Sequence, residues 1–429
     1  MLGLALRCTA RACRARAMAA VAPGEAVVTT AMSPRPSRKQ RARGPRPPKP
    51  AVDLSMLNIA VRPESYDEEL AAKVAAVRLS LSSSQLALPE QVDVYASAPR
   101  HFRLRAEFGV WHQDGRTYLC MFPKKGCPVE VTAEDFPMGS ELMCSLMPRL
   151  LAAVQTSELL NGGLFVARFH TTLSGEALLT LVYHRALDEA WRAEAEALRV
   201  SLGLVGLVGR SRGQKVVLGR DFLDEQLLVA GRQIHYRQLE ETFSQSNGGI
   251  AQHMFTWAVQ AALDGASARN DDLLELYCGS GAFTVALAPC FRRVLATEVS
   301  KGAVAVCAHN LHRNGVHNTL LGRVSAEELR EAMEGVRAYQ RLAHVELPTM
   351  QLNTVLVDPP RAGLGAQVST FLARFERILY ISCNPETMVE DVARLRGTHE
   401  LKRFACFDQF AYTPHLECGA LLVRRRGME

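Results

Sequence analysis

The sequence of 429 residues contains no run that approaches the roughly 18 consecutive apolar residues needed for a membrane-spanning helix. It also lacks a C-x-x-C pair: the eleven cysteines are scattered, and Cys120 and Cys127 stand too far apart for a zinc knuckle or an iron–sulfur site. We therefore expect no metal, no membrane span, and reduced thiols in a reducing compartment. The remaining composition, 48% apolar and 22% charged, is typical of an ordinary globular protein of two or three domains.

Acidic residues are nearly absent from residues 1–52, which hold nine Arg and two Lys against Glu25 alone. The rest of the chain carries 39 basic and 43 acidic residues, so any nucleic-acid surface on it must be local. An Arg-rich, acid-poor leader without a continuous apolar stretch is typical of transit peptides, and it predicts an organellar location, mitochondrion or chloroplast. The alternative is a basic disordered tail that assists RNA binding. A start at Met18 or Met32 would give an untargeted, cytosolic form.

Two patterns of apolar residues divide the rest of the chain. Between residues 53 and 237, helical spacing over 64–82 is followed by period-two alternation over 102–110 and by further mixed segments, which predicts an α+β domain. From residue 238 to 429, strands alternate with helices. This order predicts an α/β domain of Rossmann-like class, with a mostly parallel, doubly wound sheet.

No motif identifies the function of the first domain. Arg103 and Arg105 lie on the polar face of the alternating segment. They are candidates for contacts with the phosphates of a nucleic acid, and a solvated strand face is the equally open alternative.

The third glycine of a dinucleotide-binding turn is missing from the second domain. A strand ending at Tyr277 runs into Cys278-Gly-Ser-Gly281, but the position of the third glycine is Thr284. That glycine permits close packing against a pyrophosphate, so its absence favours a cofactor without one. Glu298 closes the following strand, where a carboxylate can accept both hydroxyls of a ribose. These features favour S-adenosyl-L-methionine and argue against the alternative, an NAD-linked oxidoreductase.

A rigid loop follows the fourth strand of this domain, Asp358-Pro359-Pro360-Arg361. Each proline locks its own φ, and Pro359 also restricts Asp358. Such a loop can present a planar base to a methyl donor. Arg361 stands where amino-methylating enzymes have an aromatic residue, which favours a carbonyl-rich base such as uracil.

A cysteine ends the fifth strand, in the segment I-L-Y-I-S-C-N-P-E around Cys383. Ligands bind at the carboxyl ends of strands in such sheets, although an isolated cysteine is often only part of the core. C5 of uracil accepts a methyl group once a thiolate has added to C6, and a base must then remove the C5 proton. Arg361 or a helix amino terminus can activate the thiol. Glu417, which opens the last strand, is the candidate base, and His415 is the competing one.

Several of these segments together resemble the RNA uracil-C5 methyltransferase family, in particular its bacterial-type tRNA members, which form ribothymidine in the T-loop. The resemblance covers about residues 64–423. The segments that carry it are F-R-L-R-A-E-F, D-L-L-E-L-Y-C-G-S-G, V-L-A-T-E, V-D-P-P-R-A-G-L, I-L-Y-I-S-C-N-P-E-T and F-D-Q-F-x-Y-T-P-H-x-E-C-G.

The resemblance implies a role for each matching residue. Cys383 matches the nucleophile and Glu417 the proton acceptor, while Arg361 would hold the target base. The positions that match contacts to S-adenosyl-L-methionine are Gln245, Tyr277, Glu298 and Asp358. The positions that match residues packing into the opened T-loop are Phe165 and His184. The first domain would then be an RNA-recognition domain and the second the methyltransferase domain, in a monomer that binds the T-arm of tRNA.

The chain also departs from the family pattern. It has Ala282 where bacterial members usually have Asn, and we expect weaker donor binding there. It lacks the extra β-barrel and the iron–sulfur cysteines of the relatives that methylate ribosomal RNA, which favours tRNA. The remaining alternatives are the same chemistry on ribosomal RNA and an RNA-binding tRNA folding factor.

Overall fold

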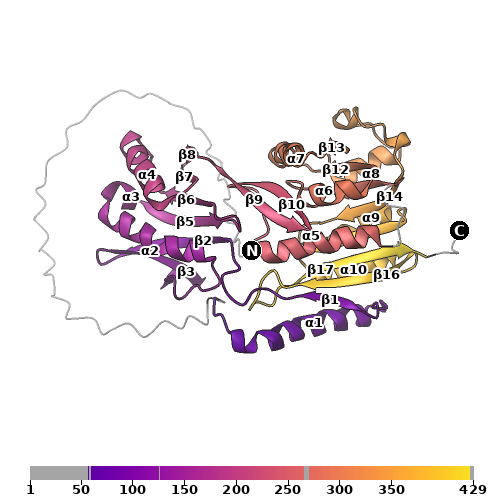
Figure 1. Ribbon diagram of the computed structural model, residues 1–429, viewed down its shortest axis with the longest axis horizontal. Coiled ribbons are helices and arrows are strands. Elements are labelled where there is room, and N and C mark those ends of the chain that lie inside the picture. Colours follow the sequence, from indigo (N-terminus) through magenta and orange to yellow (C-terminus); the bar gives the residue numbers. More distant parts are fainter. Residues whose placement is uncertain (1–56, 58, 125, 265–269, 426–429) are drawn as a thin grey trace, which may run out of the picture. The chain divides into compact units, whose positions relative to one another are not determined.

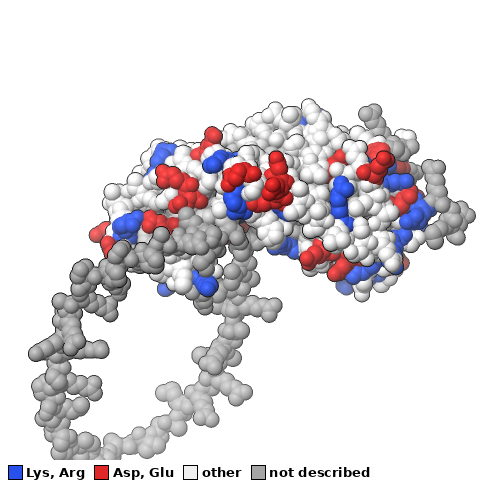
Figure 2. Space-filling model, turned by 90° about the horizontal axis from the view of Figure 1, so that it is seen from below, with Lys and Arg blue, Asp and Glu red and all other residues white. Residues whose placement is uncertain are grey.

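The computed structural model describes residues 57, 59–124, 126–264 and 270–425. The leader expected over residues 1–52 lies outside this part of the chain. Within the described residues, no helix combines the length and apolar character needed to cross a bilayer, and no cluster of three or more His, Cys, Asp or Glu is arranged to hold a metal ion. On the face shown in Figure 2, basic and acidic side chains are interspersed.

An eight-stranded sheet contains seven strands from the carboxyl-terminal half of the chain and one, β1, from the amino-terminal half (Figure 1). Its strands are β1 (Val92–Tyr95), β11 (Asp272–Leu276), β12 (Arg293–Thr297), β13 (Thr319–Gly322), β14 (Leu352–Val357), β15 (Arg377–Ser382), β16 (His399–Phe407) and β17 (Glu417–Arg424). Their order is β1-β16-β17-β15-β14-β11-β12-β13, and only β17 runs antiparallel to its neighbours. The strand order reverses direction between β11 and β14, so the carboxyl ends of these two strands flank the crevice where such sheets bind ligands.

Helices cover both faces of this sheet. They are α1 (Tyr66–Ser83), α5 (Gly248–Leu263), α6 (Ala282–Leu287), α7 (Lys301–Arg313), α8 (Ala326–Met333), α9 (Gly365–Leu372) and α10 (Pro385–Leu395), with short 3₁₀ turns η2 (Pro63–Ser65), η4 (Ala288–Cys290), η5 (Gln340–Leu342) and η6 (Leu347–Thr349). The helices α5, α6 and α7 contact one another in sequence, and α1, α10, α9 and α8 form a second series. Successive strand residues alternate between the two cores: Leu379 packs in one and Tyr380 in the other. The predicted doubly wound α/β architecture is therefore confirmed.

A seven-stranded sheet forms most of the amino-terminal half. Its strands are β2 (Arg105–Gln113), β3 (Arg116–Lys124), β4 (Cys127–Glu130), β5 (Leu164–Thr171), β6 (Ala177–Tyr183), β7 (Gly206–Ser211) and β8 (Gln214–Gly219), in the order β4-β3-β2-β5-β6-β7-β8. The pairing is antiparallel except between β6 and β7. The helices of this half are α2 (Glu141–Thr156), α3 (Glu158–Asn161) and α4 (Glu189–Leu202). A separate hairpin, β9 (Phe222–Val229) and β10 (Arg232–Leu239), follows in the chain.

The first elements of the segment 53–237 pack with the carboxyl-terminal sheet. The strand β1 pairs in parallel with β16, and α1 lies against α10. A strand of four residues carries no local signal of which distant strand it will join, so its sheet could not be assigned from the sequence.

Candidate active site

The register of β15 and β17 brings the predicted nucleophile and base together. Ser382 pairs with Cys418 in this antiparallel ladder, so Cys383 and Glu417 are the next residues opposite each other. Because β17 is antiparallel to β15, its first residue lies at the edge where the parallel strands end. Cys383 is partly exposed, whereas Glu417 is only 2% exposed. The thiol is thus accessible and the carboxylate is shielded from water.

The acidic groups of this site are poorly solvated. Burial raises the pKa of the Glu417 carboxyl to about 8, and the charge of Asp358 adds to that shift. Desolvation alone raises the pKa of Asp358 to about 7. Carboxyls with these pKa values exchange protons near neutral pH, which is the range that general acid–base catalysis requires.

The thiol of Cys383 is not activated in the free protein. Burial, followed by the carboxylates of Glu417 and Asp358, raises its pKa to about 11, although Arg361 acts in the opposite direction. The activation expected from Arg361 is therefore outweighed. The amino terminus of α10 begins immediately after Cys383, with Asn384 as its cap.

Arg361 is fixed at the entrance to this site. Its backbone carbonyl accepts a hydrogen bond from Asn384 Nδ2 at 3.0 Å, and its Nη2 donates to Nδ1 of His415 at 3.0 Å. The exposed guanidinium therefore lies beside His415, and its charge acts to lower the pKa of Glu417. It keeps donor hydrogens available for a ligand.

The loop that leads into β17 is anchored by residues to which the sequence assigned no role. Lys73 of α1 donates to Oδ1 of Asp408 at 2.6 Å and to the carbonyls of Phe410 and His415 at 3.3 and 3.4 Å. Tyr66 donates to Oδ2 of Asp408 at 2.8 Å. The signal available in the sequence was a lysine on the apolar side of the 64–82 helix, but its partner stands 335 residues away.

Two of the residues predicted to bind S-adenosyl-L-methionine form hydrogen bonds with neighbouring segments of the site. Gln245 accepts from Nε2 of Gln409 at 2.9 Å, and Gln409 also accepts from the backbone N–H of Asn247. Glu298, at the end of β12, accepts from the backbone N–H of Gly279 at 3.2 Å and from that of Ser300 at 2.7 Å. The carboxylate of Glu298 is therefore hydrogen-bonded directly to the glycine turn.

The backbone of the glycine turn is held in an uncommon conformation. Tyr277 has φ of 61° and Gly281 has φ of 82°. A side chain on Gly281 would place its Cβ 2.4 Å from Sγ of Cys307, so only glycine fits. A non-glycine residue such as Tyr277 in the left-handed region is frequent at binding sites. Ala282 is the first residue of α6, which has no side-chain cap.

The predicted RNA-binding pair lies on the other sheet. The rings of Phe165 and His184 stack in parallel, with centroids 3.7 Å apart and an interplanar angle of 7°. Phe165 is on β5 and His184 directly follows β6, so the structure brings these two together but on the amino-terminal sheet rather than at the strand ends that carry Cys383.

The two arginines considered for phosphate contacts are instead engaged with the backbone. Arg105 donates to the carbonyls of Thr242 and Glu240 at 2.6 and 2.7 Å, and Arg103 donates to the carbonyl of Arg105. The guanidinium groups of both arginines bind backbone carbonyls, so they neither face solvent freely nor stand ready to contact phosphates. Arg105 joins β2 of the seven-stranded sheet to the segment of Glu240 and Thr242, which directly precedes Gln245.

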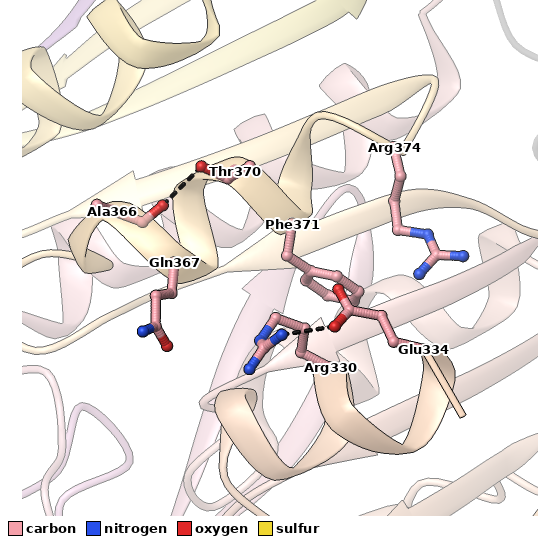
Figure 3. Close-up of a pocket in the computed structure, with 7 residues that line it drawn as sticks. All are labelled: Arg330, Glu334, Ala366, Gln367, Thr370, Phe371 and Arg374. Atoms are coloured by element: carbon pink, nitrogen blue, oxygen red, sulfur yellow. Dashed lines mark hydrogen bonds and ion pairs between the residues drawn. The ribbon is translucent and has the colours of Figure 1, made fainter. Parts of the chain in front are cut away.

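A cavity of about 640 Å³ lies apart from these strand ends, between α8 and α9 (Figure 3). Its lining residues are Arg330, Glu334, Ala366, Gln367, Thr370, Phe371 and Arg374. Arg330 of α8 donates to Glu334, which follows the last residue of the same helix, at 2.5 Å. None of the residues predicted from the sequence to act in catalysis or binding lines this cavity.

The sequence profile of the tRNA (Uracil-5-)-methyltransferase family matches residues 65–425. The chain belongs to this family. This match confirms the predicted family and enzyme class. It also confirms the predicted reaction in outline, which is methyl transfer from S-adenosyl-L-methionine to C5 of uracil in tRNA. The family also favours tRNA over the ribosomal RNA alternative.

Relatives in bacteria are similar over almost their whole length. A tRNA/tmRNA (uracil-C(5))-methyltransferase of Stutzerimonas stutzeri is 49% identical over 363 residues, which is 85% of this chain and 98% of the relative. The enzyme of that name from Dechloromonas aromatica is 47% identical over the same shares. The relatives are bacterial, so the prediction of an organellar location was wrong. The compositional signal of a transit peptide is not specific, because any basic, disordered extension shares it.

A solved structure with the same fold is the Pyrococcus abyssi tRNA (uracil-54, C5)-methyltransferase in complex with S-adenosyl-L-homocysteine. It has a TM-score of 0.63 and 20% sequence identity, and the similarity covers 83% of each chain. At this identity the likeness shows the fold, and it confirms the predicted Rossmann-like methyltransferase class.

Proposed function

We propose that this chain methylates C5 of a uridine in the T-loop of tRNA through a transient covalent bond between Cys383 and C6 of the base. The observation that carries the proposal is the β15–β17 register, which sets a partly exposed thiol opposite a buried carboxylate. A uracil between them would have C6 beside the thiol and C5 beside the carboxylate. The relatives named above are tRNA/tmRNA (uracil-C(5))-methyltransferases, which supports tRNA as the substrate. The Phe165–His184 stack supports binding of an unpaired RNA loop.

The residues around the crevice fit S-adenosyl-L-methionine. Gln245, Tyr277, Glu298 and Asp358 would hold it, around the glycine turn that precedes α6. The donor carries positive charge, and the desolvated carboxyl of Asp358, with its raised pKa, gains a counter-charge when a cation binds. When bound, the donor supplies an electrophilic methyl group for C5.

The protein's own residues perform the remaining chemistry. The Cys383 thiol loses its proton to solvent, and its sulfur then forms a bond to C6 while the C5–C6 π electrons move toward the carbonyl oxygen. Arg361 donates to that oxygen and stabilises its developing charge. After methylation, Glu417 takes the proton from C5. The electrons of that C–H bond restore the C5–C6 double bond as the bond between sulfur and C6 breaks.

The charges in the site explain why a protonated resting thiol is compatible with this reaction. Asp358 and Glu417 raise the pKa of the thiol, and Arg361 lowers it. A bound cationic donor offsets the two carboxylates, so donor binding favours the thiolate. The nucleophile is then generated when the methyl group is present.

The test is methylation of an unmodified tRNA transcript by the purified full-length protein, with mass-spectrometric mapping of the product. We expect one 5-methyluridine, located in the T-loop, and none in ribosomal RNA incubated in parallel. Product elsewhere in the tRNA would reject the T-loop assignment, and binding without any methyl transfer would favour the folding-factor alternative. We also expect a monomer by light scattering.

A further inference from the structure

The seven-stranded sheet has one core face and one polar and aromatic face. Along β2, Ala106, Phe108 and Val110 are buried in the core, on the side where α2 contacts β3 and β5. Because strand residues alternate, Gly109 and Trp111 point to the opposite face. We call this opposite side the open face. It carries side chains that the fold does not need for its core.

Aromatic side chains gather at one end of the open face. Trp111 pairs with Tyr118 of β3, and its ring lies 6.1 Å from that of Phe122. Phe122 is 46% exposed and its ring covers Gly109, where a Cβ would stand only 2.5 Å from the ring. Trp111 and Tyr118 are partly exposed. Three neighbouring aromatic side chains that the core does not fully bury make this part of the open face a candidate binding surface.

This group continues into the Phe165–His184 stack. Gly109 pairs with Val166 of β5, so Trp111, two residues further along β2, lies beside the bulge between Leu164 and Val166. Phe165 occupies that bulge. The adjacent strands β3, β2 and β5, and the residue that follows β6, therefore carry Tyr118, Trp111, Phe165 and His184 at the same end of the sheet. We call these four residues the aromatic row.

Basic side chains and the predicted donor site border the open face. The guanidinium of Arg116 lies 5.8 Å from the ring centroid of Tyr118, and Arg168 pairs with Glu107 at a surface position. At the other end, Arg105 is bonded to Glu240 and Thr242, close in sequence to Gln245. The face thus runs from the aromatic row to a segment of the methyltransferase site. Aromatic rings interleaved with arginines are the features that bind unpaired nucleic acid.

We propose that Trp111 and Tyr118 extend the RNA-binding site beyond Phe165 and His184, and that Trp111 stacks on an unpaired base of the substrate loop. The proposal rests on the proposed function, since it takes the RNA to be the T-arm. Stacking on an aromatic ring requires a free base face, which a loop offers and a duplex does not.

The chain offers a direct optical test, because it contains three tryptophans and the other two, Trp191 and Trp257, are fully buried. A T-arm hairpin RNA is titrated into the full-length protein and the intrinsic fluorescence is recorded. We expect quenching that is lost in Trp111→Phe while the affinity changes less than twofold, because phenylalanine still stacks. Trp111→Ala should weaken binding roughly tenfold. A duplex RNA of the same stem should cause no quenching.

Val200→Ala is the matched control, since Val200 is a 64% exposed apolar side chain on α4, away from the open face. It should leave both affinity and quenching unchanged. Quenching that persists in Trp111→Phe, or an unchanged affinity in Trp111→Ala, would overturn the inference. If Trp111→Ala does not fold, the Trp111→Phe result decides. Methylation of the same hairpin by the unmodified protein is measured in parallel: if it occurs while Trp111 has no effect, only this inference fails.

Discussion

Arg361 donates a hydrogen bond from Nη2 to Nδ1 of His415 over 3.0 Å. A guanidinium can only donate, so Nδ1 of His415 is the acceptor and carries no proton. Burial, together with the charge of Arg361, lowers the pKa of His415. His415 therefore remains neutral, and its one basic nitrogen is already occupied. This relationship favours Glu417 as the group that removes the C5 proton.

Replacing the base should trap the reaction part-way. In Glu417→Gln the methylated adduct forms but cannot lose its proton, so we expect a covalent protein–tRNA complex that survives denaturing electrophoresis, with turnover reduced at least a hundredfold. His415→Gln is the matched variant: it should retain turnover within about tenfold and accumulate no complex. The reverse pattern would transfer the role of base to His415.

The pH dependence of kcat/KM should report the electrostatic coupling between the carboxyls of Glu417 and Asp358. Glu417 must be ionised to act as a base, and its pKa is about 8, whereas the Cys383 thiol, which must lose its proton, has a pKa of about 11. A logarithmic plot of kcat/KM against pH should therefore rise more steeply below pH 8, where both groups titrate, than above it, where only the thiol does. Asp358 raises the pKa of Glu417 through like charge, so in Asp358→Asn the change of slope should occur at a lower pH. A change of slope that stays at the same pH would show that the two carboxyls are not coupled.

The ion pair between α1 and the loop before β17 should contribute strongly to stability. The side chains of Lys73 and Asp408 are 10% and 0% exposed, so Lys73→Met leaves a buried charge without its partner. Loss of one member of a buried pair costs about 3–5 kcal/mol of unfolding free energy. We expect a loss of this size in urea unfolding, and a partial recovery in the double variant Lys73→Met/Asp408→Asn.

The control for that prediction is an exposed pair. Arg116 and Glu130 are 67% and 41% exposed, and Arg116→Ala should change the unfolding free energy by less than about 1 kcal/mol. Equal effects of Lys73→Met and Arg116→Ala would remove the case for α1 as a support of the active-site loop.

The glycine turn offers a matched pair of substitutions. Gly279→Ala places a Cβ in open space at φ of 54°, so it costs about 1–2 kcal/mol of backbone strain. Gly281→Ala adds a contact of 2.4 Å with Sγ of Cys307, and overpacking of this kind costs about 1–3 kcal/mol more. Adding Cys307→Ala to Gly281→Ala should restore part of the difference. Thermal unfolding of the four proteins checks the order, and equal losses for the two glycine variants would contradict it.

The strand ends and the side chains that they carry could be located from the sequence because the signals are local. Each signal lies within a few residues of the chain. The signals are a short apolar strand that runs into Cys383, the prolines that restrict Asp358, and the glycine turn. The alternation of strands and helices then predicts a parallel sheet, which gathers such ends at one edge.

Long-range pairings could not be predicted in the same way. Lys73 and Asp408 are joined only by the fold, and nothing near either residue identifies the other. The sequence also did not predict that the pKa of the Cys383 thiol is raised in the free protein. Arg361 lowers this pKa as expected, but burial and two carboxylates outweigh its effect. Electrostatic balance depends on the spatial arrangement of all groups in the site, and the sequence does not contain that arrangement.

The proposed reaction requires a transient bond between Cys383 and the pyrimidine ring. The measurement is mass spectrometry of the peptide cross-linked to tRNA that contains 5-fluorouridine, in which fluorine replaces the C5 proton and the adduct cannot resolve. We predict a methylated 5-fluorouridine attached to the peptide that contains Cys383, and no cross-link in Cys383→Ala. A cross-link that persists in Cys383→Ala, or that maps to another residue, would contradict it.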